Sequence, residues 1–122
     1  MKKKVFIIDT SAILSGKPIT IHDAALVTPP GVSNELNPGG RDFRMFEILK
    51  ETGLTVQAPS KEAIQSVLTT AQETGDDRRL SNADIEIVAL ALDINKKHDH
   101  EAIILSDDYS IQNVASTLGL QF

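Results

Sequence analysis

The chain has 122 residues, a hydrophobic fraction of 41% and a formal net charge of −5 at pH 7. This length and hydrophobic content are typical of a single folded domain, residues 1–122, and exclude a disordered chain. The absence of cysteine excludes disulfide bonds and thiolate metal sites, so we expect no zinc in this chain. The negative charge excludes a protein covered by basic surface, but it leaves room for acids that gather around bound cations.

The N-terminal region carries no pattern of a targeting or membrane segment. No apolar run approaches the roughly 20 residues that a membrane span requires. The apolar stretch after the N-terminal lysines is interrupted by Asp9, so we expect no signal peptide. We therefore expect a cytoplasmic protein that has no contact with a membrane.

The first half of the chain alternates between strand and helix patterns. We expect strands at 4–9, 25–28 and 54–58 and helices at 11–16, 32–36 and 41–51. Turn formers separate them: Gly16 with Pro18, the pair Pro29 and Pro30, and the run 37–40. The first strand is a short, continuous apolar run, which is typical of a buried strand.

The second half continues the alternation. Ser60 is expected to cap a helix at 61–73, whose apolar face would carry Ala63, Ile64, Val67, Leu68 and Ala71. After the polar break "TGDDRR", residues 82–97 are apolar almost all round and predict a buried helix. A strand at 102–105 and a helix at 109–118 follow, and "LQF" at 120–122 is a possible fifth strand. The whole pattern predicts an α/β fold with three layers: a central parallel sheet of four to five strands, flanked by helices.

Acidic residues follow two of the predicted strands directly. Asp9 follows the first strand, and Asp107 and Asp108 follow the fourth. Each position also suits a helix cap, but one cap needs only one acid. Because ligand sites of open parallel sheets lie outside the carboxyl ends of the strands, two strands that both end in aspartate favour a shared site there.

Two further acids belong to segments that should reach the same edge. Asp84 opens the apolar helix, although with Ser81 it also fits a capping box. Glu35 follows the second strand, where a lone glutamate is otherwise a solvated surface residue. Carboxylates gathered in this way repel one another unless cations or protons occupy them, and oxygen ligands select one or two Mg²⁺ or Mn²⁺ ions.

This set of residues is typical of phosphodiester hydrolysis. A bound divalent ion acidifies and orients water, so no histidine base is required. The three histidines, His22, His98 and His100, are expected at the surface. Thr10 and Ser11 are expected either to cap the next helix or to donate hydrogen bonds to the carboxylates or the phosphate.

The order of the motifs "IIDTSAIL", "TPPGVSNEL", "LSNADIEIVALAL" and "ILSDDYSIQNVASTLGL" resembles a PIN domain, a fold of metal-dependent ribonucleases. The last two motifs resemble the Nob family, endonucleases that mature the 3′ end of small-subunit ribosomal RNA. The resemblance covers almost the whole chain. It implies catalytic and metal-holding roles for Asp9, Glu35, Asp84 and one of Asp107 and Asp108.

The resemblance also bears on the neighbouring hydroxyl groups and on a missing segment. It assigns Ser11 to the small hydroxyl of the family's "DTS" motif and Ser106 to the hydroxyl residue after the fourth strand. Nob proteins usually continue into a zinc ribbon with paired cysteines, which this chain does not contain; that segment would be separate or missing. The resemblance therefore implies cleavage of single-stranded precursor ribosomal RNA, and it leaves the oligomeric state open.

Two rival functions remain beside this one. A VapC-type toxin ribonuclease would share the acids but not "DDYSIQNVA". A non-catalytic RNA-binding scaffold in ribosome assembly would have lost acids, whereas every acid position is filled here. As residues that contact RNA, we favour Arg78 and Arg79 over Arg41 and Arg44. Tyr109 is the aromatic candidate for stacking on a base; its alternative role is to pack at the start of a helix.

Overall fold

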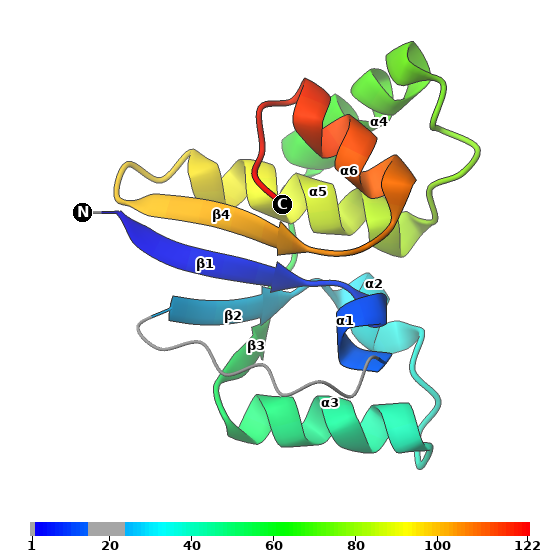
Figure 1. Ribbon diagram of the computed structural model, residues 1–122, viewed down its shortest axis with the longest axis vertical. Coiled ribbons are helices and arrows are strands. Elements are labelled where there is room, and N and C mark those ends of the chain that lie inside the picture. The colour runs from blue at the N-terminus through cyan, green and yellow to red at the C-terminus, as the bar shows by residue number, and fades with distance from the viewer. Residues whose placement is uncertain (1, 15–23) are drawn as a thin grey trace.

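The computed structural model describes residues 2–14 and 24–122. Its elements are β1 (Lys3–Ile8), α1 (Thr10–Leu14), β2 (Ala24–Thr28), α2 (Pro30–Asn34), α3 (Arg41–Glu51), β3 (Leu54–Val56), α4 (Lys61–Thr74), α5 (Asn82–Asn95), β4 (His100–Leu105) and α6 (Tyr109–Thr117) (Figure 1). Gly16, Pro18 and His22 lie outside the described residues, as does the predicted end of the first helix.

The four strands form one parallel sheet in the order β3-β2-β1-β4. This confirms the predicted α/β fold with a parallel sheet. The possible fifth strand at 120–122 is wrong: in the described part of the chain, this segment makes a single bridge, between Ile103 and Gln121. The chain reaches this segment through a left-handed turn at Gly119, where φ is +73°.

The strand order reverses next to β1. The chain passes from β1 to β2 and on to β3, and then crosses back to place β4 on the other side of β1. Figure 1 shows the matching division of the helices: α3 lies beside β3 and contacts α1, whereas α5 packs against β4 and contacts α4 and α6. The switch point of the sheet therefore lies between the carboxyl ends of β1 and β4.

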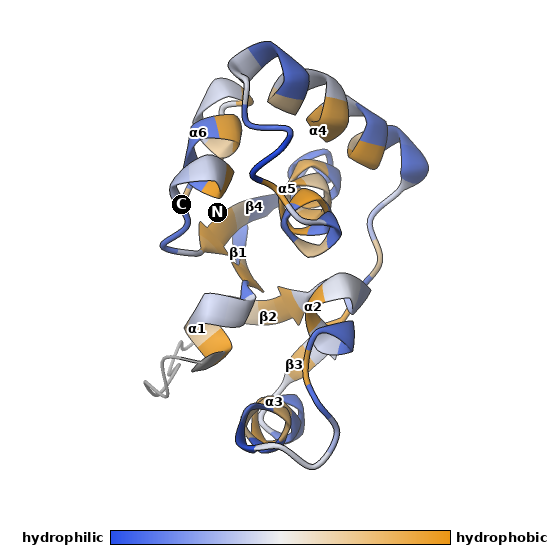
Figure 2. Cartoon of the chain, turned by 90° about the vertical axis from the view of Figure 1, so that its right-hand side faces the viewer, coloured by the Kyte–Doolittle hydropathy of each residue, from blue (hydrophilic) through white to orange (hydrophobic). Residues whose placement is uncertain are grey.

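The centre of the fold is α5, which packs against β1, β4, α4 and α6. Its run from Ile87 to Ala91 is fully buried, and Figure 2 shows hydrophobic residues around it, whereas α4 is hydrophilic on its outer side. This confirms the predicted buried helix, which ends at Asn95 rather than Lys97. The Asn95 side chain accepts a hydrogen bond from the Ala102 backbone N–H at 2.7 Å and so ties the helix end to β4.

Three local expectations need correction. Leu68 is 37% exposed, because α4 contacts α5 through Ala63, Val67 and Ala71, and Leu68 is rotated to the side of that stripe. The third strand ends at Val56 rather than residue 58, since it pairs with β2 alone at the edge of the sheet. His100 is half-buried at the start of β4 rather than at the surface, with Nδ1 2.6 Å from Asp99 Oδ1.

Candidate active site

Asp9 lies at the switch point, directly after β1, and is only 5% exposed. Its carboxylate is held from both sides. Oδ1 accepts a hydrogen bond from the Thr10 backbone N–H at 2.8 Å, and Oδ2 accepts from the hydroxyls of Ser106 at 2.7 Å and Ser11 at 3.4 Å. The backbone N–H of Asp9 donates to Leu105 O at 3.2 Å, which fixes the end of β1 against the end of β4.

Ser106 connects Asp9 with the segment that carries Asp108. While its hydroxyl donates to Asp9, the same oxygen accepts a hydrogen bond from the Asp108 backbone N–H at 3.1 Å. The Asp108 side chain caps α6 by accepting from the N–H groups of Ser110 and Ile111, at 2.8 and 3.3 Å. Asp108 therefore combines the expected cap with a place beside Asp9.

Asp84 also combines two features. It forms the predicted capping box with Ser81: Asp84 Oδ2 accepts from the Ser81 N–H at 2.9 Å, and Ser81 Oγ accepts from the Asp84 N–H at 3.1 Å. The cap begins α5, and because α5 packs against β1 and β4, its first turn comes to the same edge of the sheet as Asp9.

Three of the acids influence one another electrostatically. Burial raises the pKa of Asp9 above its usual 3.8, and the negative charge of Asp108 also raises it. The hydrogen bonds from Ser106, Thr10 and Ser11 lower this pKa but do not cancel the rise. Burial likewise raises the pKa of Asp84, with the charges of Asp9 and Asp108 adding to it against the hydrogen bonds from Ser81. Asp9, Asp84 and Asp108 thus form one cluster of carboxylates.

Glu35 joins this edge through Thr10. The predicted helix around it starts earlier than expected, so that Glu35 is an exposed residue directly after α2 rather than within it. Its Oε2 accepts a hydrogen bond from the Thr10 hydroxyl at 3.0 Å, while the Thr10 N–H binds Asp9. Thr10 therefore bridges two of the predicted acids.

Two interactions that position this edge have no signal in the sequence. The buried Thr28 hydroxyl donates to Ile8 O at 2.7 Å and holds the ends of β1 and β2 together. The Gly31 N–H at the start of α2 donates to Glu86 Oε1 of α5 at 3.2 Å. Both partners are far away in the chain, so only the tertiary fold brings them together.

The remaining predicted residues lie around the cluster rather than in it. Asp107 is exposed and, unlike Asp108, does not contribute to the pKa shifts of Asp9 or Asp84. Arg78 and Arg79 are exposed on the loop before α5, whereas Arg41 and Arg44 are exposed on α3, on the side of Glu35. Tyr109 is 87% exposed, so its alternative interpretation as a packed residue is wrong.

The chemistry of the cluster fits a hard divalent cation, because every donor is a carboxylate or hydroxyl oxygen. Within residues 2–14 and 24–122, neither Asp9 nor Asp84 has a basic partner within 4 Å. Over the same residues, no three carboxylate or imidazole groups are already arranged around one ion position. Asp84 and Asp108 direct oxygens into their helix caps, so the cluster has the charge that a cation would neutralise but not a preformed ligand set.

The sequence profile described as "PIN domain of ribonuclease" matches residues 6–94. The chain belongs to the PIN domain family. Its relatives include Ribonuclease VapC3 of Aeropyrum pernix, 37% identical over 97% of this chain and 84% of the relative. Ribonuclease VapC1 of Thermoplasma acidophilum is 38% identical over 97% of this chain and 56% of the relative. Endoribonuclease Nob1 of Archaeoglobus fulgidus is 36% identical over 98% of this chain and 67% of the relative.

These similarities confirm the predicted resemblance to the PIN domain and to Nob proteins. The profile match ends at residue 94, before β4 and α6. The segment between those two elements nevertheless contributes Ser106 and Asp108 to the surroundings of Asp9. The alignments with VapC3 and VapC1 also cover 97% of this chain, so the extent of the similarity does not by itself separate Nob from VapC relatives.

Proposed function

We propose that this PIN domain is a metal-dependent endoribonuclease that hydrolyses phosphodiester bonds in single-stranded RNA. The observation that supports this most is the position of Asp9. Its buried carboxylate lies at the switch point of a parallel sheet, is crowded by Asp84 and Asp108, and has no basic partner among the described residues. Membership of a ribonuclease family adds to this support.

Each acid has a role that follows from its surroundings. Asp9, Asp84 and Asp108 would hold Mg²⁺ or Mn²⁺, as one or two ions, and Asp107 would approach from the solvent side. Such a cation would polarise the phosphodiester and acidify an attacking water. Glu35 is exposed and oriented by Thr10, which suits it to accept a proton at the solvent side of the cluster. The hydroxyls of Ser106 and Ser11 keep Asp9 in one orientation.

The first experiment compares the parent chain with Asp9→Asn and Asp84→Asn on a labelled single-stranded RNA in Mn²⁺ or Mg²⁺. We expect each variant to lose roughly 100-fold or more in cleavage rate, the scale of losing one electrostatic or acid–base contributor. EDTA should abolish the parent activity. Glu47→Gln, at an exposed position of α3, is the matched control and should cleave at the parent rate. An Asp9→Asn variant as active as the parent in Mn²⁺ would refute the proposal.

For the substrate we propose the 3′ boundary of small-subunit precursor ribosomal RNA, supported by four Nob1 relatives at 33–36% identity. The VapC relatives, at 37 and 38% identity, give equal support to a second candidate, a toxin-type ribonuclease that cleaves tRNA or mRNA. A cleavage panel with a precursor rRNA 3′ fragment, tRNAs and an mRNA discriminates between them. One preferred cut at the rRNA boundary supports the first, and cuts confined to tRNA or mRNA support the second.

The non-catalytic alternative and the location of the protein are also testable. A scaffold domain would bind RNA without cleaving it in any divalent metal, which the same panel detects. In the part of the chain that the structure describes, no helix is both long and apolar enough to span a bilayer. A cytoplasmic location stays a prediction, to be checked by fractionation.

A further inference from the structure

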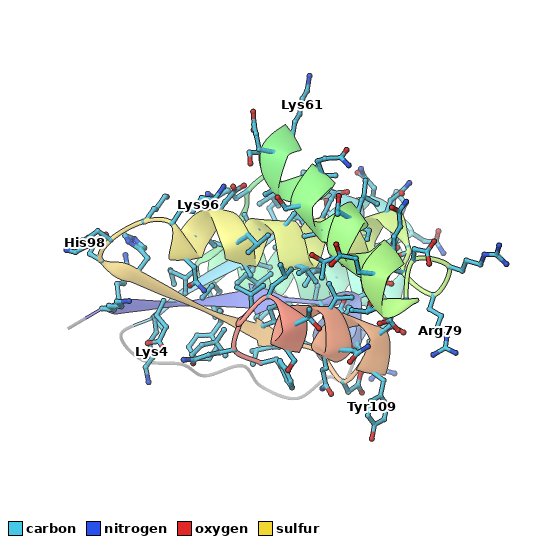
Figure 3. All side chains as sticks on the ribbon, turned by 90° about the horizontal axis from the view of Figure 1, so that it is seen from above. Lys4, Lys61, Arg79, Lys96, His98 and Tyr109 are labelled. Carbon is cyan, nitrogen blue, oxygen red and sulfur yellow. The ribbon has the colours of Figure 1, made fainter. Side chains whose placement is uncertain are left out.

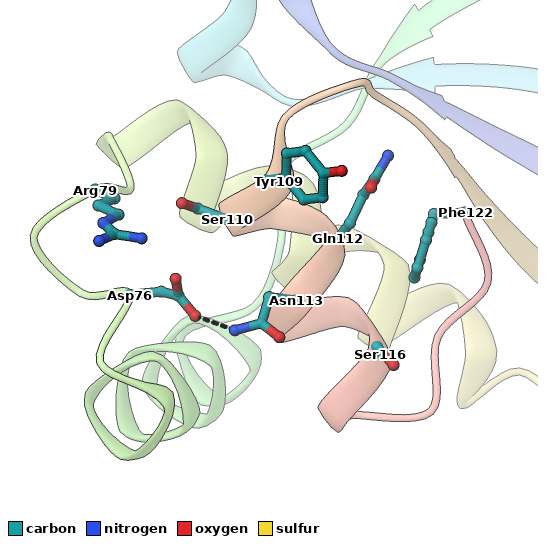
Figure 4. Close-up of a pocket in the computed structure, with 8 residues that line it drawn as sticks. All are labelled: Asp76, Arg79, Tyr109, Ser110, Gln112, Asn113, Ser116 and Phe122. Atoms are coloured by element: carbon teal, nitrogen blue, oxygen red, sulfur yellow. Dashed lines mark hydrogen bonds between the residues drawn. The ribbon is translucent and has the colours of Figure 1, made fainter.

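A hollow of about 450 Å³ lies beside the acid cluster, between α6, the loop before α5 and the C-terminal Phe122 (Figure 4). Its lining adjoins Asp108: Tyr109 directly follows this acid, and the Ser110 N–H donates to Asp108 Oδ1 at 2.8 Å. Figure 3 shows Tyr109 and Arg79 projecting at the same end of the molecule. We call this hollow the α6 pocket; its volume lies within the roughly 300–1,000 Å³ typical of sites for small ligands.

The two exposed aromatic side chains of the protein, Tyr109 and Phe122, line the α6 pocket. The chain contains one tyrosine, four phenylalanines and no tryptophan. Phe46 is buried, and Phe6 and Phe43 pack against the core. Tyr109 and Phe122, by contrast, are 87% and 53% exposed, and both line the pocket. Exposed aromatic faces beside a cavity are suitable stacking surfaces for a planar ligand.

The polar groups of the pocket suit the edge of a neutral, planar ligand. Gln112 donates its amide N–H to Ser106 O at 3.0 Å, and Asn113 donates to Asp76 Oδ2 at 2.6 Å (Figure 4). Each amide therefore keeps a carbonyl oxygen that can accept from a ligand. Hydrogen bonds from Thr74 and Asn113 hold the pKa of Asp76 below its usual value, so this carboxylate is committed to fixing the loop against α6.

Gln112 connects the pocket to the hydroxyl that holds Asp9. Gln112 binds the backbone oxygen of Ser106, whose hydroxyl holds Asp9. Arg79 adds a positive charge at the rim and lowers the pKa of Asp76, although within the described residues no carboxylate lies within 4 Å of it. The arrangement combines stacking faces, hydrogen-bond acceptors and one cation next to a site for phosphodiester cleavage.

From this combination we propose that the α6 pocket binds a nucleobase of the RNA, one neighbouring the cleaved phosphodiester, stacked on Tyr109 and Phe122. Gln112 and Asn113 accept hydrogen bonds from the edge of the base, and Arg79 contacts the adjoining backbone phosphate. This inference rests on the proposed ribonuclease function, because it extends the same site by one nucleotide subsite.

Tyr109 provides a direct readout, because it is the only tyrosine in a chain without tryptophan. The first experiment titrates a short single-stranded oligoribonucleotide into the Asp9→Asn chain, which should bind without cleaving, and follows tyrosine fluorescence. Stacking of a base should quench this emission. The matched probe is the same oligomer with abasic sites, which should quench much less at equal occupancy. Equal quenching by the two probes would overturn the proposal.

The second experiment measures the affinity of the same oligomer by fluorescence anisotropy in the Asp9→Asn background. Tyr109→Ala and Phe122→Ala should each weaken binding roughly 5- to 100-fold, corresponding to about 1–3 kcal/mol per stacked base. Tyr109→Phe keeps the ring and should stay within about twofold of the parent. Ile48→Ala, at a position that is also exposed but lies on α3, is the control and should not change the affinity.

The outcomes separate failure of the pocket from failure of the proposed function. If the parent cleaves RNA but Tyr109→Ala and Phe122→Ala retain parent affinity, the pocket assignment is wrong and the ribonuclease proposal stands. A docking surface for a protein partner would give this same result. If the parent never cleaves RNA while both variants bind it more weakly than the parent, the pocket assignment stands and the ribonuclease proposal fails.

Discussion

Ser106 is the residue on which the geometry of the acid cluster depends most directly. One hydroxyl donates to Asp9 Oδ2 and accepts from the Asp108 backbone N–H, so it sets the spacing between the ends of β1 and β4. Its hydrogen bond also lowers the pKa of Asp9 against the effect of burial. Removing this hydroxyl should therefore change both the position and the protonation of Asp9.

The first prediction concerns Ser106→Ala. We expect a loss of about 1–3 kcal/mol in the free energy of unfolding, since a hydrogen bond to a partly buried charged group disappears. The pKa of Asp9 should rise further, which moves the acid limb of the cleavage profile to higher pH. Chemical denaturation and a pH–rate profile measure the two effects, and Ser66→Ala, exposed on α4, is the control. An unmoved acid limb would contradict the role given to Ser106.

The second prediction follows from the raised pKa values of Asp9 and Asp84. Between the unfolded value near 3.8 and the higher folded value, the folded state binds more protons than the unfolded state. Stability therefore falls as pH rises through this window, and at neutral pH the charged carboxylates destabilise the fold. In metal-free buffer, Asp9→Asn should gain stability relative to the parent as pH rises from 4 to about 7.5.

Urea unfolding in EDTA at several pH values measures this difference. Glu47→Gln, at an exposed position of α3, is the control for the loss of a surface carboxylate. The prediction fails if Asp9→Asn instead becomes less stable than the parent as pH increases.

At the scale of elements, the contact between α2 and α5 brings Glu35 and Asp84 to the same edge. Gly31 lies so close to α5 that a Cβ there would overlap the Glu86 carboxylate and approach Ala83 Cα to 3.0 Å. The Glu86 carboxylate occupies the space beside Gly31 and accepts its N–H. A side chain at position 31 would therefore have to displace the Glu86 carboxylate and shift α2 slightly away from α5.

The third prediction is that Gly31→Ala displaces α2. We expect a loss of about 1–3 kcal/mol, the usual effect of overpacking, and a slower cleavage rate because Glu35 moves with the helix. Asn34→Ala, at an exposed position of the same helix, is the control for helix propensity. Thermal unfolding and RNA cleavage are the measurements; equal stability of the two variants would show that the contact is not tight.

Local patterns were enough to predict the elements and several caps, whereas contacts between elements were not predictable. Ser60 and Ser81 cap their helices as expected, and α5 is buried as its composition indicates. The convergence of Asp9, Asp84 and Asp108 follows from the rule for parallel sheets once strands and helices alternate. The Gly31–Glu86 contact, the Thr28 hydrogen bond and the exposure of Tyr109 depend on how distant segments pack, so no local pattern encodes them.

At the scale of the whole molecule, a group of exposed lysines lies at the opposite end of the sheet from the acid cluster. Exposed lysines gather at the amino ends of the strands, on β1 and after α5 (Lys2, Lys3, Lys4, Lys96 and Lys97), and Figure 3 shows Lys4 and Lys96 far from Arg79. A strand of this length spans about 20 Å, well beyond the screening length of about 8 Å at physiological salt. These lysines are therefore too far away to neutralise the acid cluster.

The fourth prediction is that a divalent cation stabilises the entire fold. Binding to the folded state alone adds about 2.7 kcal/mol at 100 times the dissociation constant, which corresponds to roughly 10 °C in melting temperature for a chain of this size. Calorimetry with MnCl₂, against NaCl of equal ionic strength, should show this rise for the parent and for Glu47→Gln. Asp9→Asn should lose most of it, because the cation then faces one charge fewer at the switch point. An equal rise in the melting temperature of Asp9→Asn would show that the cation binds at another site, which does not include Asp9 and the carboxyl ends of β1 and β4.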